Sequence, residues 1–550
     1  MIDIEQYLQE AIAAALHRLG VDPTEVTIRL EPPKQEQFGD LACNIALQLA
    51  SQQKRAPRAI AEAIVSALAL DSNLIEKVEI AGAGFINFYL GWGYYRQAVA
   101  HIIQRGDEFG QSHWGNGVKI QIEFVSANPT GPLNVVSARA AAVGDVMVNL
   151  YRAVGFHADR EFYINDAGRQ VRLLGASVSS RYMELLGQNE PFPEEGYHGE
   201  YVRDLAREIA DQYGDRFLQL SLEERQEQLA KLALQKMIAL QQQMMHRYGV
   251  HFDTWFPESK LREANEHLDV LKQLEQAGYT YHDQGAIWFR STRFGDEKDR
   301  VLITSEGEPT YFLVDIAYHR NKYQRGYQKL YDIWGPDHHG YIPRMTAAIQ
   351  ALGYPKESFQ VEIVQQVNLL RAGEIVKMSK RAGQIITMEE LIDEVGVDAA
   401  RFFFVNRKCS SHLDFDIDLA KKQSDENPVY YVQYAHARIF NIIKFAEQQG
   451  YCIDPTADLQ QLNQEEEKQL IRKLLQYPDV ISKATEFWEP HRLTNYLQDL
   501  AGIFHHFYQK HRVVTDNVPL TQARLLLCQA TRLVFANGLK ILGITAPERM

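Results

Sequence analysis

Basic side chains gather between residues 371 and 381, in a stretch that contains Gly373 and is followed by Gly383. The cations are Arg371, Lys377, Lys380 and Arg381, and the single acid among them is Glu374. A run of charges is most often a solvated surface. Ammonium groups on a loop flanked by glycines can also close over a triphosphate and stabilise the charge that develops as pyrophosphate leaves. The pattern alone leaves a surface loop and a phosphate-binding loop open.

A second candidate for phosphate chemistry runs from Glu123 to Asp145. A β-rich run over residues 120–125 leads into a loop rich in turn-forming residues, and helix-forming sequence follows, with Ser137 as the expected N-cap. The loop holds Asn128, Pro129, Thr130, Gly131 and Pro132. A helix that starts beside such a loop offers free N–H groups and the positive end of its dipole to a phosphate. Because every parallel α/β fold has strand-to-helix turns, an ordinary first turn is an equally good interpretation of the pattern.

Acidic residues stand at two further places. Asp315 lies within an apolar and aromatic run over residues 310–319, where a lone aspartate is usually a cap or a structural salt bridge. Asp337 precedes His338 and His339, but no third ligand follows at a recognisable spacing. We therefore predict no protein-bound metal, zinc included.

The composition is that of a soluble globular protein. The chain has 550 residues, of which 45% are hydrophobic and 23% charged, and its net charge is −13. Its length predicts roughly three or four domains. Four cysteines without CxxC pairing indicate a reducing cytoplasm, and we expect no signal peptide and no apolar run long enough to span a membrane. The acidic balance argues against indiscriminate nucleic-acid binding, so any RNA would need local basic patches.

The order of the predicted elements places these candidates in an α/β protein. A second parallel strand is predicted over Phe162-Tyr163-Ile164. Strands joined by helices indicate a doubly wound sheet with ligands at the C-terminal strand ends. We expect an N-terminal α/β domain over 1–112, a catalytic domain over 113–385 with a helical insertion at about 186–265, a connector over 386–424 and an all-α bundle over 425–550.

Several of these stretches resemble the motifs of one family. Glu123-Phe124, Ser126, Asn128-Pro129-Thr130-Gly131-Pro132-Leu133, Arg139 and Gly144-Asp145 closely resemble the nucleotide-site signature of arginyl-tRNA synthetases, which are class I synthetases with a Rossmann-type catalytic domain. Lys377-Met378-Ser379-Lys380 is the second class I signature, intact. The resemblance extends, in family order, from Phe38-Gly39-Asp40 to the helical C-terminus.

The resemblance implies an arginine–tRNA ligase. Such an enzyme activates L-arginine with ATP and Mg²⁺ to arginyl-adenylate and transfers it to the terminal ribose of tRNA-Arg. The family is mostly monomeric, its N-terminal domain contacts the tRNA elbow and its C-terminal bundle binds the anticodon.

Carried over to this sequence, the catalytic residues are Lys377, Ser379 and Lys380. The ATP-binding residues are Pro129, Thr130, Gly131, Pro132, Leu133, Asn134, Val136, Ser137 and Met378. The arginine-binding residues are Glu123, Asn128, Tyr311, Asp315 and Asp337, and acidic and carbonyl acceptors suit a planar guanidinium with five donors.

The sequence departs from the family at the nucleotide site. The family continues after Leu133 with His-(Val/Ile)-Gly-His, whereas this chain has Asn134, Val135, Val136 and Ser137. In the family the histidines donate to ATP phosphates and the glycine leaves room for adenine, a space that the Val136 side chain would occupy. Two hypotheses follow: a working ligase with an altered signature, or a silenced homologue that still binds arginine or tRNA. The intact Lys377–Lys380 motif favours the first.

Overall fold

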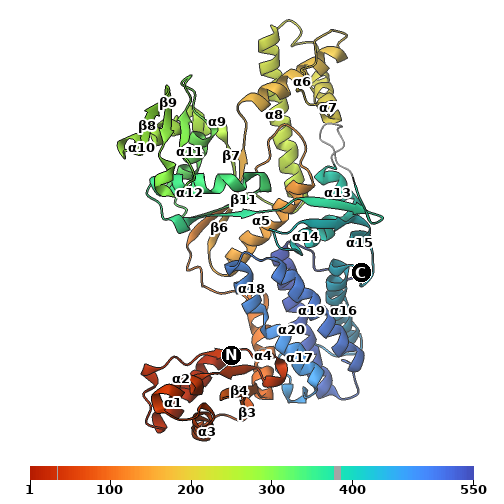
Figure 1. Ribbon diagram of the computed structural model, residues 1–550. Helices are drawn as coiled ribbons and strands as arrows, with labels where there is room; N and C mark the ends of the chain where they lie inside the picture. The colour runs from red at the N-terminus through yellow and green to blue at the C-terminus, as the bar shows by residue number, and fades with distance from the viewer. Residues whose placement is uncertain (34, 377–385) are drawn as a thin grey trace.

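The computed structural model describes residues 1–33, 35–376 and 386–550. Figure 1 shows a parallel sheet at the centre of the molecule, a helical unit above it, and the N-terminal domain and a helical bundle below it. The predicted fold class is confirmed: a Rossmann-type α/β catalytic domain stands between an N-terminal α/β domain and a C-terminal all-α bundle.

The N-terminal domain is a four-stranded antiparallel sheet, of order β1-β2-β4-β3, packed with helices. Asp3 caps the first helix by accepting from the Gln6 N–H, and Leu8, Ile12 and Leu16 of that helix are fully buried at helical spacing. The elements are α1 (Ile4–Arg18), β1 (Leu30–Glu31), β2 (Leu41–Cys43), α2 (Ile45–Gln53), α3 (Pro57–Ala67), β3 (Ile75–Ala81), β4 (Phe85–Leu90) and α4 (Trp92–Arg105).

The central sheet has five parallel strands in the order β12-β11-β5-β6-β7. The strands are β5 (Lys119–Glu123), β6 (His157–Ile164), β7 (Thr254–Pro257), β11 (Lys329–Trp334) and β12 (Phe359–Ile363). The crossover helix α5 (Val135–Ala153) lies closely on β5, because a Cβ at Gly144 would meet the Phe124 ring at 2.2 Å. Because the strands are parallel, the C-terminal ends of β5, β6 and β11 lie at one edge of the sheet, where ligands of such folds bind.

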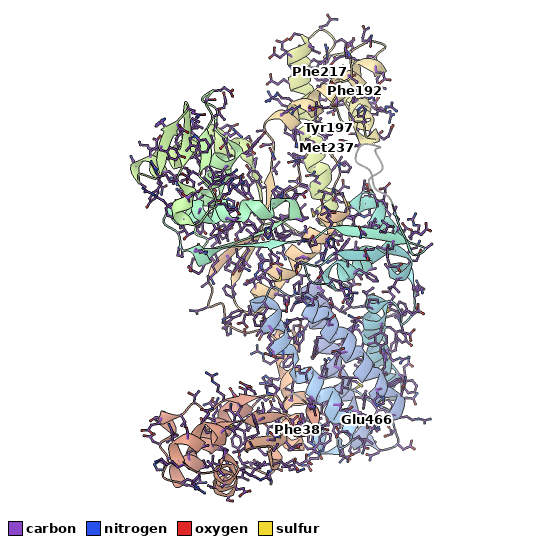
Figure 2. The ribbon with its side chains drawn as sticks, in the orientation of Figure 1. Phe38, Phe192, Tyr197, Phe217, Met237 and Glu466 are labelled. Atoms are coloured by element: carbon purple, nitrogen blue, oxygen red, sulfur yellow. The ribbon has the colours of Figure 1, made fainter. Side chains whose placement is uncertain are left out.

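A helical unit is inserted between β6 and β7. It consists of α6 (Arg169–Leu185), α7 (Glu200–Tyr213) and α8 (Leu222–Arg247), and it has a core of its own that includes Phe217 and Met237 (Figure 2). The structure differs here from the insertion expected at about 186–265, because α6 already packs in this unit and β7 has returned to the central sheet by residue 254.

A second small unit packs against the central sheet. Its three-stranded antiparallel sheet, of order β10-β9-β8, packs with neighbouring helices around Phe289, Leu302 and Phe312. The elements are α9 (Glu258–Glu263), α10 (Glu266–Gln276), β8 (Thr280–Asp283), β9 (Ala286–Phe289), β10 (Arg300–Ile303), α11 (Tyr311–Gln324) and α12 (Ile342–Ala351).

The connector joins the sheet to the bundle. It contains α13 (Met388–Val395), α14 (Val397–Val405), β15 (Leu413–Asp416) and α15 (Ile417–Lys421). The strands β13 (Val367–Arg371) and β14 (Glu374–Ile375) precede it, and β13 pairs with β15. The fully buried Arg139 of α5 donates to the carbonyl oxygens of Gln365, Lys408 and Ser411 at 2.8–3.1 Å, which fixes the connector to the helix that follows β5.

The C-terminal bundle comprises α16 (Pro428–Gln448), α17 (Glu465–Leu475), α18 (Tyr477–Glu486), α19 (His491–Lys510) and α20 (Val518–Leu542). By length and composition α20 could cross a membrane, so the prediction that no apolar run is long enough was wrong. Two-thirds of its most apolar window is buried within the protein, as in the core helix of a bundle.

Candidate active site

The backbone after β5 is held in an unusual conformation. Val125 and Ser126 have φ values of +69° and +40°, in a region that a β-branched residue rarely adopts. The Ser126 hydroxyl donates to Glu123 Oε1 at 2.7 Å and accepts from the Tyr163 N–H at 3.1 Å. These two bonds stabilise the turn, and strained backbone of this kind is often found at functional sites.

The helix that follows begins at Val135, and its N-cap is Asn134. The Asn134 Oδ1 atom accepts from the Ser137 N–H at 3.0 Å and lies 3.3 Å from the Ser137 hydroxyl. The prediction that Ser137 caps this helix was therefore wrong, because Ser137 is the third helical residue and Asn134 already occupies the capping position. Asn134, where the family has a histidine, thus has a structural role in starting α5.

The six residues 128–133, which we call the nucleotide loop, contain most of the predicted ATP-binding residues. Pro129, Thr130 and Leu133 are buried, Gly131 is half-buried and Pro132 is exposed. Asn134, Val136 and Ser137, at the start of α5, are half-buried. The structure therefore brings these residues together at the edge of the sheet where β5 ends.

The predicted loop residues Lys377, Met378, Ser379 and Lys380 lie outside the described residues. The described flanks are β14, which ends at Ile375, and α13, which Thr387 caps. Asn134 and Thr387 form an isolated antiparallel bridge, and the Met388 N–H donates to the Leu133 carbonyl at 2.8 Å. The chain that leaves this segment therefore lies directly beside the nucleotide loop.

Three carboxylates lie side by side across the central strands. Glu123 is the register partner of both Glu161 on β6 and Asp332 on β11, and all three are buried. The Lys322 Nζ atom, fully buried on α11, lies 2.5 Å from Glu123 Oε2 and 3.0 Å from Asp332 Oδ1. Arg325, one turn further along α11, forms a bidentate pair with Glu161 at 2.6 and 2.7 Å.

This network changes the interpretation of Glu123. Burial by itself would lower the pKa of Lys322, but Asp332, Glu123 and Glu161 raise it above its ordinary value, so the ammonium group stays charged. Glu123 therefore shares its negative charge with an internal cation, and of the predicted acidic residues Asp315 is the better placed to attract a substrate cation.

Asp315 projects from the first turns of α11 and is half-buried. Burial raises its pKa to about 6, against the opposing effect of the Tyr341 hydroxyl, which donates to Oδ2 at 2.6 Å. Of the nearby charges, His319 lowers the pKa, and two carboxylates, Glu258 and Glu123, raise it to a smaller extent. A desolvated carboxylate beside other acids attracts a cation such as a guanidinium, because the positive charge stabilises the ionised carboxylate.

The remaining predicted arginine-binding residues surround this carboxylate less closely. Tyr311, one turn before Asp315 on α11, is 63% exposed, and a Cβ at Gly168 would lie 3.6 Å from its hydroxyl. Asn128, on the nucleotide loop, and Asp337, in the 3-10 helix Pro336–Tyr341, are exposed, and within the described part of the chain neither side chain makes a hydrogen bond. They are thus free to meet a ligand, but no protein contact orients them.

Several residues of the site were missed in the sequence analysis. Glu258 is 3% exposed at the start of α9, and Tyr163 has a buried hydroxyl without a hydrogen-bond partner in the described structure. Tyr341, which orients Asp315, is the third. Glu258 follows a short strand and is a potential helix-start acid, but no local pattern could place it beside Asp315, 57 residues later. Within the described ranges, no group of three His, Cys, Asp or Glu residues could hold a metal ion.

Comparison with known proteins decides the family. The model of the "tRNA synthetases class I (R), catalytic domain" family matches residues 98–424, which is more than half of the chain. The chain belongs to the arginyl-tRNA synthetase family. The "Arginyl tRNA synthetase N terminal domain" model matches residues 6–90 and the "DALR anticodon binding domain" model matches residues 432–550, so family domains account for nearly the whole sequence.

Individual members of the arginyl-tRNA synthetase family are similar along their full length. The Arginine–tRNA ligase of Desulforamulus reducens is 46% identical over 550 residues, which covers 99% of this chain and 97% of that protein. The Arginine–tRNA ligase of Geobacillus kaustophilus is 47% identical over 551 residues and covers 100% and 99%. The Thermus thermophilus arginyl-tRNA synthetase structure, 23% identical with a TM-score of 0.73 over the whole of both chains, has the same fold.

Proposed function

We propose that this chain is a working arginine–tRNA ligase, which activates L-arginine with ATP and transfers it to the 3′-terminal ribose of tRNA-Arg. The observation that carries this proposal is Asp315: a half-buried carboxylate with a raised pKa, oriented by Tyr341 and surrounded by further acids. A guanidinium is permanently charged and presents paired donors, so it complements such a site better than a lysine ammonium does. Tyr311, Asn128, Asp337 and Glu123 are assigned to the rest of the arginine site.

ATP is assigned to the nucleotide loop and the start of α5. The helix dipole and the first-turn N–H groups attract phosphate without any histidine. Asn134 accepts from α5 through its Oδ1 atom, which leaves its amide NH₂ as a neutral donor. Mg²⁺ is assigned to the phosphates of ATP as its counterion.

The chemistry assigned to the site is a transfer at the α-phosphorus. The carboxylate oxygen of arginine bonds to that phosphorus, and the bond to the bridging oxygen breaks with release of pyrophosphate. Lys377 and Lys380 are assigned to stabilise the negative charge on pyrophosphate, with Ser379 and Met378 beside the nucleotide. The terminal ribose hydroxyl of tRNA then takes the arginyl group and releases AMP.

Arginine binding should depend on the protonation of Asp315. The free carboxyl has a pKa of about 6, and a bound guanidinium would lower that value. Binding is therefore fully favourable above pH 6, and the Kd for arginine should rise by up to about tenfold per pH unit below it. Calorimetric titration of the chain with arginine between pH 8 and pH 5 measures this dependence.

Tyr341→Phe provides the matched comparison. The hydroxyl of Tyr341 lowers the pKa of Asp315, so its removal should move the midpoint of the profile to higher pH. A Kd that is constant from pH 8 to pH 5 in both proteins would contradict the assignment of Asp315 to the guanidinium.

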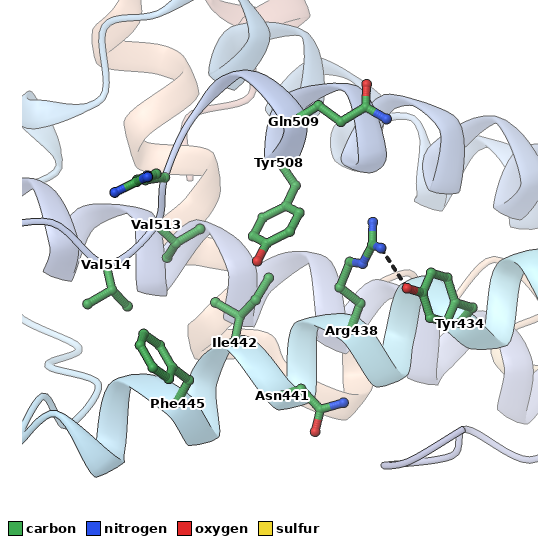
Figure 3. A pocket seen from close by; sticks show the side chains of 10 residues that line it. Tyr434, Arg438, Asn441, Ile442, Phe445, Tyr508, Gln509, Val513 and Val514 are labelled. Atoms are coloured by element: carbon green, nitrogen blue, oxygen red, sulfur yellow. Dashed lines mark hydrogen bonds between the residues drawn. The ribbon is translucent and has the colours of Figure 1, made fainter.

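The anticodon is assigned to a groove of about 730 Å³ between α16 and the end of α19 (Figure 3). Phe445 is 52% exposed and Tyr508 36% exposed, and the Arg438 guanidinium lies 4.6 Å from the centre of the Tyr434 ring. Exposed aromatic rings interleaved with arginine form a stacking surface for unpaired bases within an otherwise acidic protein.

Loss of an aromatic ring from this groove should weaken tRNA binding. Stacking of one base contributes about 1–3 kcal/mol, so Tyr508→Ala should raise the Kd for tRNA-Arg about 5- to 150-fold and leave arginine binding unchanged. Filter binding of labelled tRNA-Arg measures the effect. Phe487→Ala is the control, because Phe487 is 54% exposed on the same bundle but does not line the groove. Equal losses in both variants would argue against a specific groove.

The other assignments follow from the proposed activity. The N-terminal domain, residues 1–112, is assigned to the tRNA elbow, the catalytic domain to 113–385, the connector to 386–424 and the anticodon-binding bundle to 425–550. We expect a cytoplasmic monomer. Charging of tRNA-Arg with labelled arginine tests the proposal, and a chain that binds arginine and tRNA but never forms arginyl-tRNA would instead be a silenced homologue.

A further inference from the structure

Among the described residues, the hydrogen bonds to the nucleotide loop come from other parts of the chain. Three of its carbonyl oxygens accept hydrogen bonds from two side chains of the helical unit inserted between β6 and β7. The Gln241 Nε2 atom on α8 donates to the carbonyls of Asn128 and Gly131 at 3.2 and 3.1 Å. The Tyr201 hydroxyl on α7 donates to the carbonyl of Thr130, between them in the chain, at 2.7 Å.

The donor groups of both side chains are shielded from water. Gln241 is 2% exposed, so its amide has little access to water. The Tyr201 hydroxyl lies in a desolvated position, and burial raises its pKa, so it stays protonated and able to donate. A buried carbonyl that lost its donor would be left unsatisfied, which makes such bonds strong constraints on backbone position.

Gly131 fits the same arrangement. A Cβ at residue 131 would lie 3.3 Å from the Tyr201 hydroxyl, so a side chain there would press on the donor that holds the preceding carbonyl. A groove of about 240 Å³ lies where the loop meets the inserted helical unit, and both Tyr201 and Gln241 line it together with Leu133. The hydrogen bonds from Gln241 and Tyr201 therefore act together with the burial of Thr130 and Leu133 to fix the position of the loop.

We propose that Gln241 and Tyr201 are positioning residues for ATP: the inserted helical unit sets the geometry of the nucleotide loop through these two side chains. The inference rests on the proposed function, because it requires that the loop binds ATP. It assigns to the insertion a part in activation that neither side chain could have through direct chemistry, since both face backbone carbonyls. It also supplies a means of fixing the loop in a chain that lacks the family's histidines at 134 and 137.

The test is ATP–pyrophosphate exchange by the full chain with saturating arginine and tRNA-Arg. Gln241→Leu keeps the size of the side chain but removes both donated bonds, and it should raise the KM for ATP about tenfold. Tyr201→Phe removes one bond and should raise that KM about threefold. The KM for arginine, measured at saturating ATP, should stay within twofold in Tyr201→Phe. In Gln241→Leu it should rise by less than the KM for ATP, because Gln241 also holds the carbonyl of Asn128, which is assigned to the arginine site. Gln242→Leu, the same change on an exposed residue of α8 that does not line the groove, should leave every parameter unchanged.

Each outcome decides the matter. A rise in the KM for ATP alone in Tyr201→Phe, with a larger rise for ATP than for arginine in Gln241→Leu, supports positioning of the nucleotide loop. If Gln241→Leu lowers the melting temperature and kcat while both KM values stay at the wild-type level, the residue is only structural and the inference is wrong. A variant that folds poorly is replaced by Tyr201→Phe, judged by the same split between the two KM values. A wild-type chain that shows no exchange would overturn the proposed function itself, and this inference with it.

Discussion

Asp315→Asn should reduce kcat/KM for arginine by about thirtyfold or more in the charging reaction. The substitution keeps the shape of the side chain and an acceptor oxygen for the Tyr341 hydroxyl, but it removes the charge that faces the guanidinium. Removal of one partner from a desolvated, hydrogen-bonded ion pair costs about 2–5 kcal/mol, and each 1.4 kcal/mol is tenfold in rate. Steady-state aminoacylation at varied arginine concentration measures the loss.

The same substitution at an exposed acid is the control for Asp315→Asn. Asp211 lies exposed on α7, so Asp211→Asn should leave kcat/KM for arginine within twofold. The KM for ATP should change little in either variant, because Asp315 is assigned only to the amino acid. A loss of less than tenfold in Asp315→Asn would mean that Glu123 or Glu258 provides the main negative charge for arginine.

Lys322→Met should lower the free energy of unfolding by about 3–5 kcal/mol at pH 7. The lysine is fully buried between Glu123 and Asp332, which are register partners on adjacent strands. Its removal leaves two buried carboxylates facing each other with the His319 ring, 2.8 Å from Asp332 Oδ2, beside them, and breaking a buried ion pair in this way is strongly destabilising. Urea denaturation of the two proteins measures the difference.

The effect of Lys322→Met should shrink at low pH. Although burial raises the pKa of Asp332, Lys322 and His319 hold it at about 2, so wild type keeps this stabilisation down to acidic pH. Without Lys322 the folded pKa of Asp332 should rise above the unfolded value of about 3.9, and the penalty is then relieved as the pH falls through the new folded pKa.

Two variants bracket this interpretation. Lys322→Met/Asp332→Asn should recover a large part of the lost stability, because one of the facing charges is gone. Lys272→Met, at an exposed lysine of α10, should cost less than about 0.5 kcal/mol. A Lys322→Met protein as stable as wild type at pH 7 would show that the carboxylates are not both ionised in the folded chain.

The fold could be predicted from the sequence because its signals are local. The β-rich run before residue 125 and the apolar helical spacing after residue 135 are recorded in consecutive residues, and the order of strands and helices follows from them. The exact start of α5 was misjudged, since Asn134 and Ser137 are both good N-caps by type. Only the backbone conformation distinguishes them.

The site could be predicted in part. Asp315 was found because the family motif contains it. Its partner Tyr341 and the buried Glu258 are brought to it by folding, as is Lys322 to Glu123 across 199 residues of sequence. Gln241 could not be recognised for the same reason: a glutamine on a long charged helix has the composition of a solvated surface, and only the packing of α8 against the nucleotide loop gives its buried amide two carbonyl acceptors. Long-range pairing of polar groups has no local pattern.

The most direct test of the central claim compares this chain with the variant Asn134→His/Val136→Gly/Ser137→His, which restores the family's signature. Both are assayed for charging of tRNA-Arg with labelled arginine and ATP. We expect the two rates to agree within about tenfold, or roughly 1.4 kcal/mol of barrier, because the α5 N-terminus and the fixed nucleotide loop hold ATP without the histidines. If only the restored variant charges tRNA-Arg, this chain is a silenced synthetase and the account given for its nucleotide site is wrong.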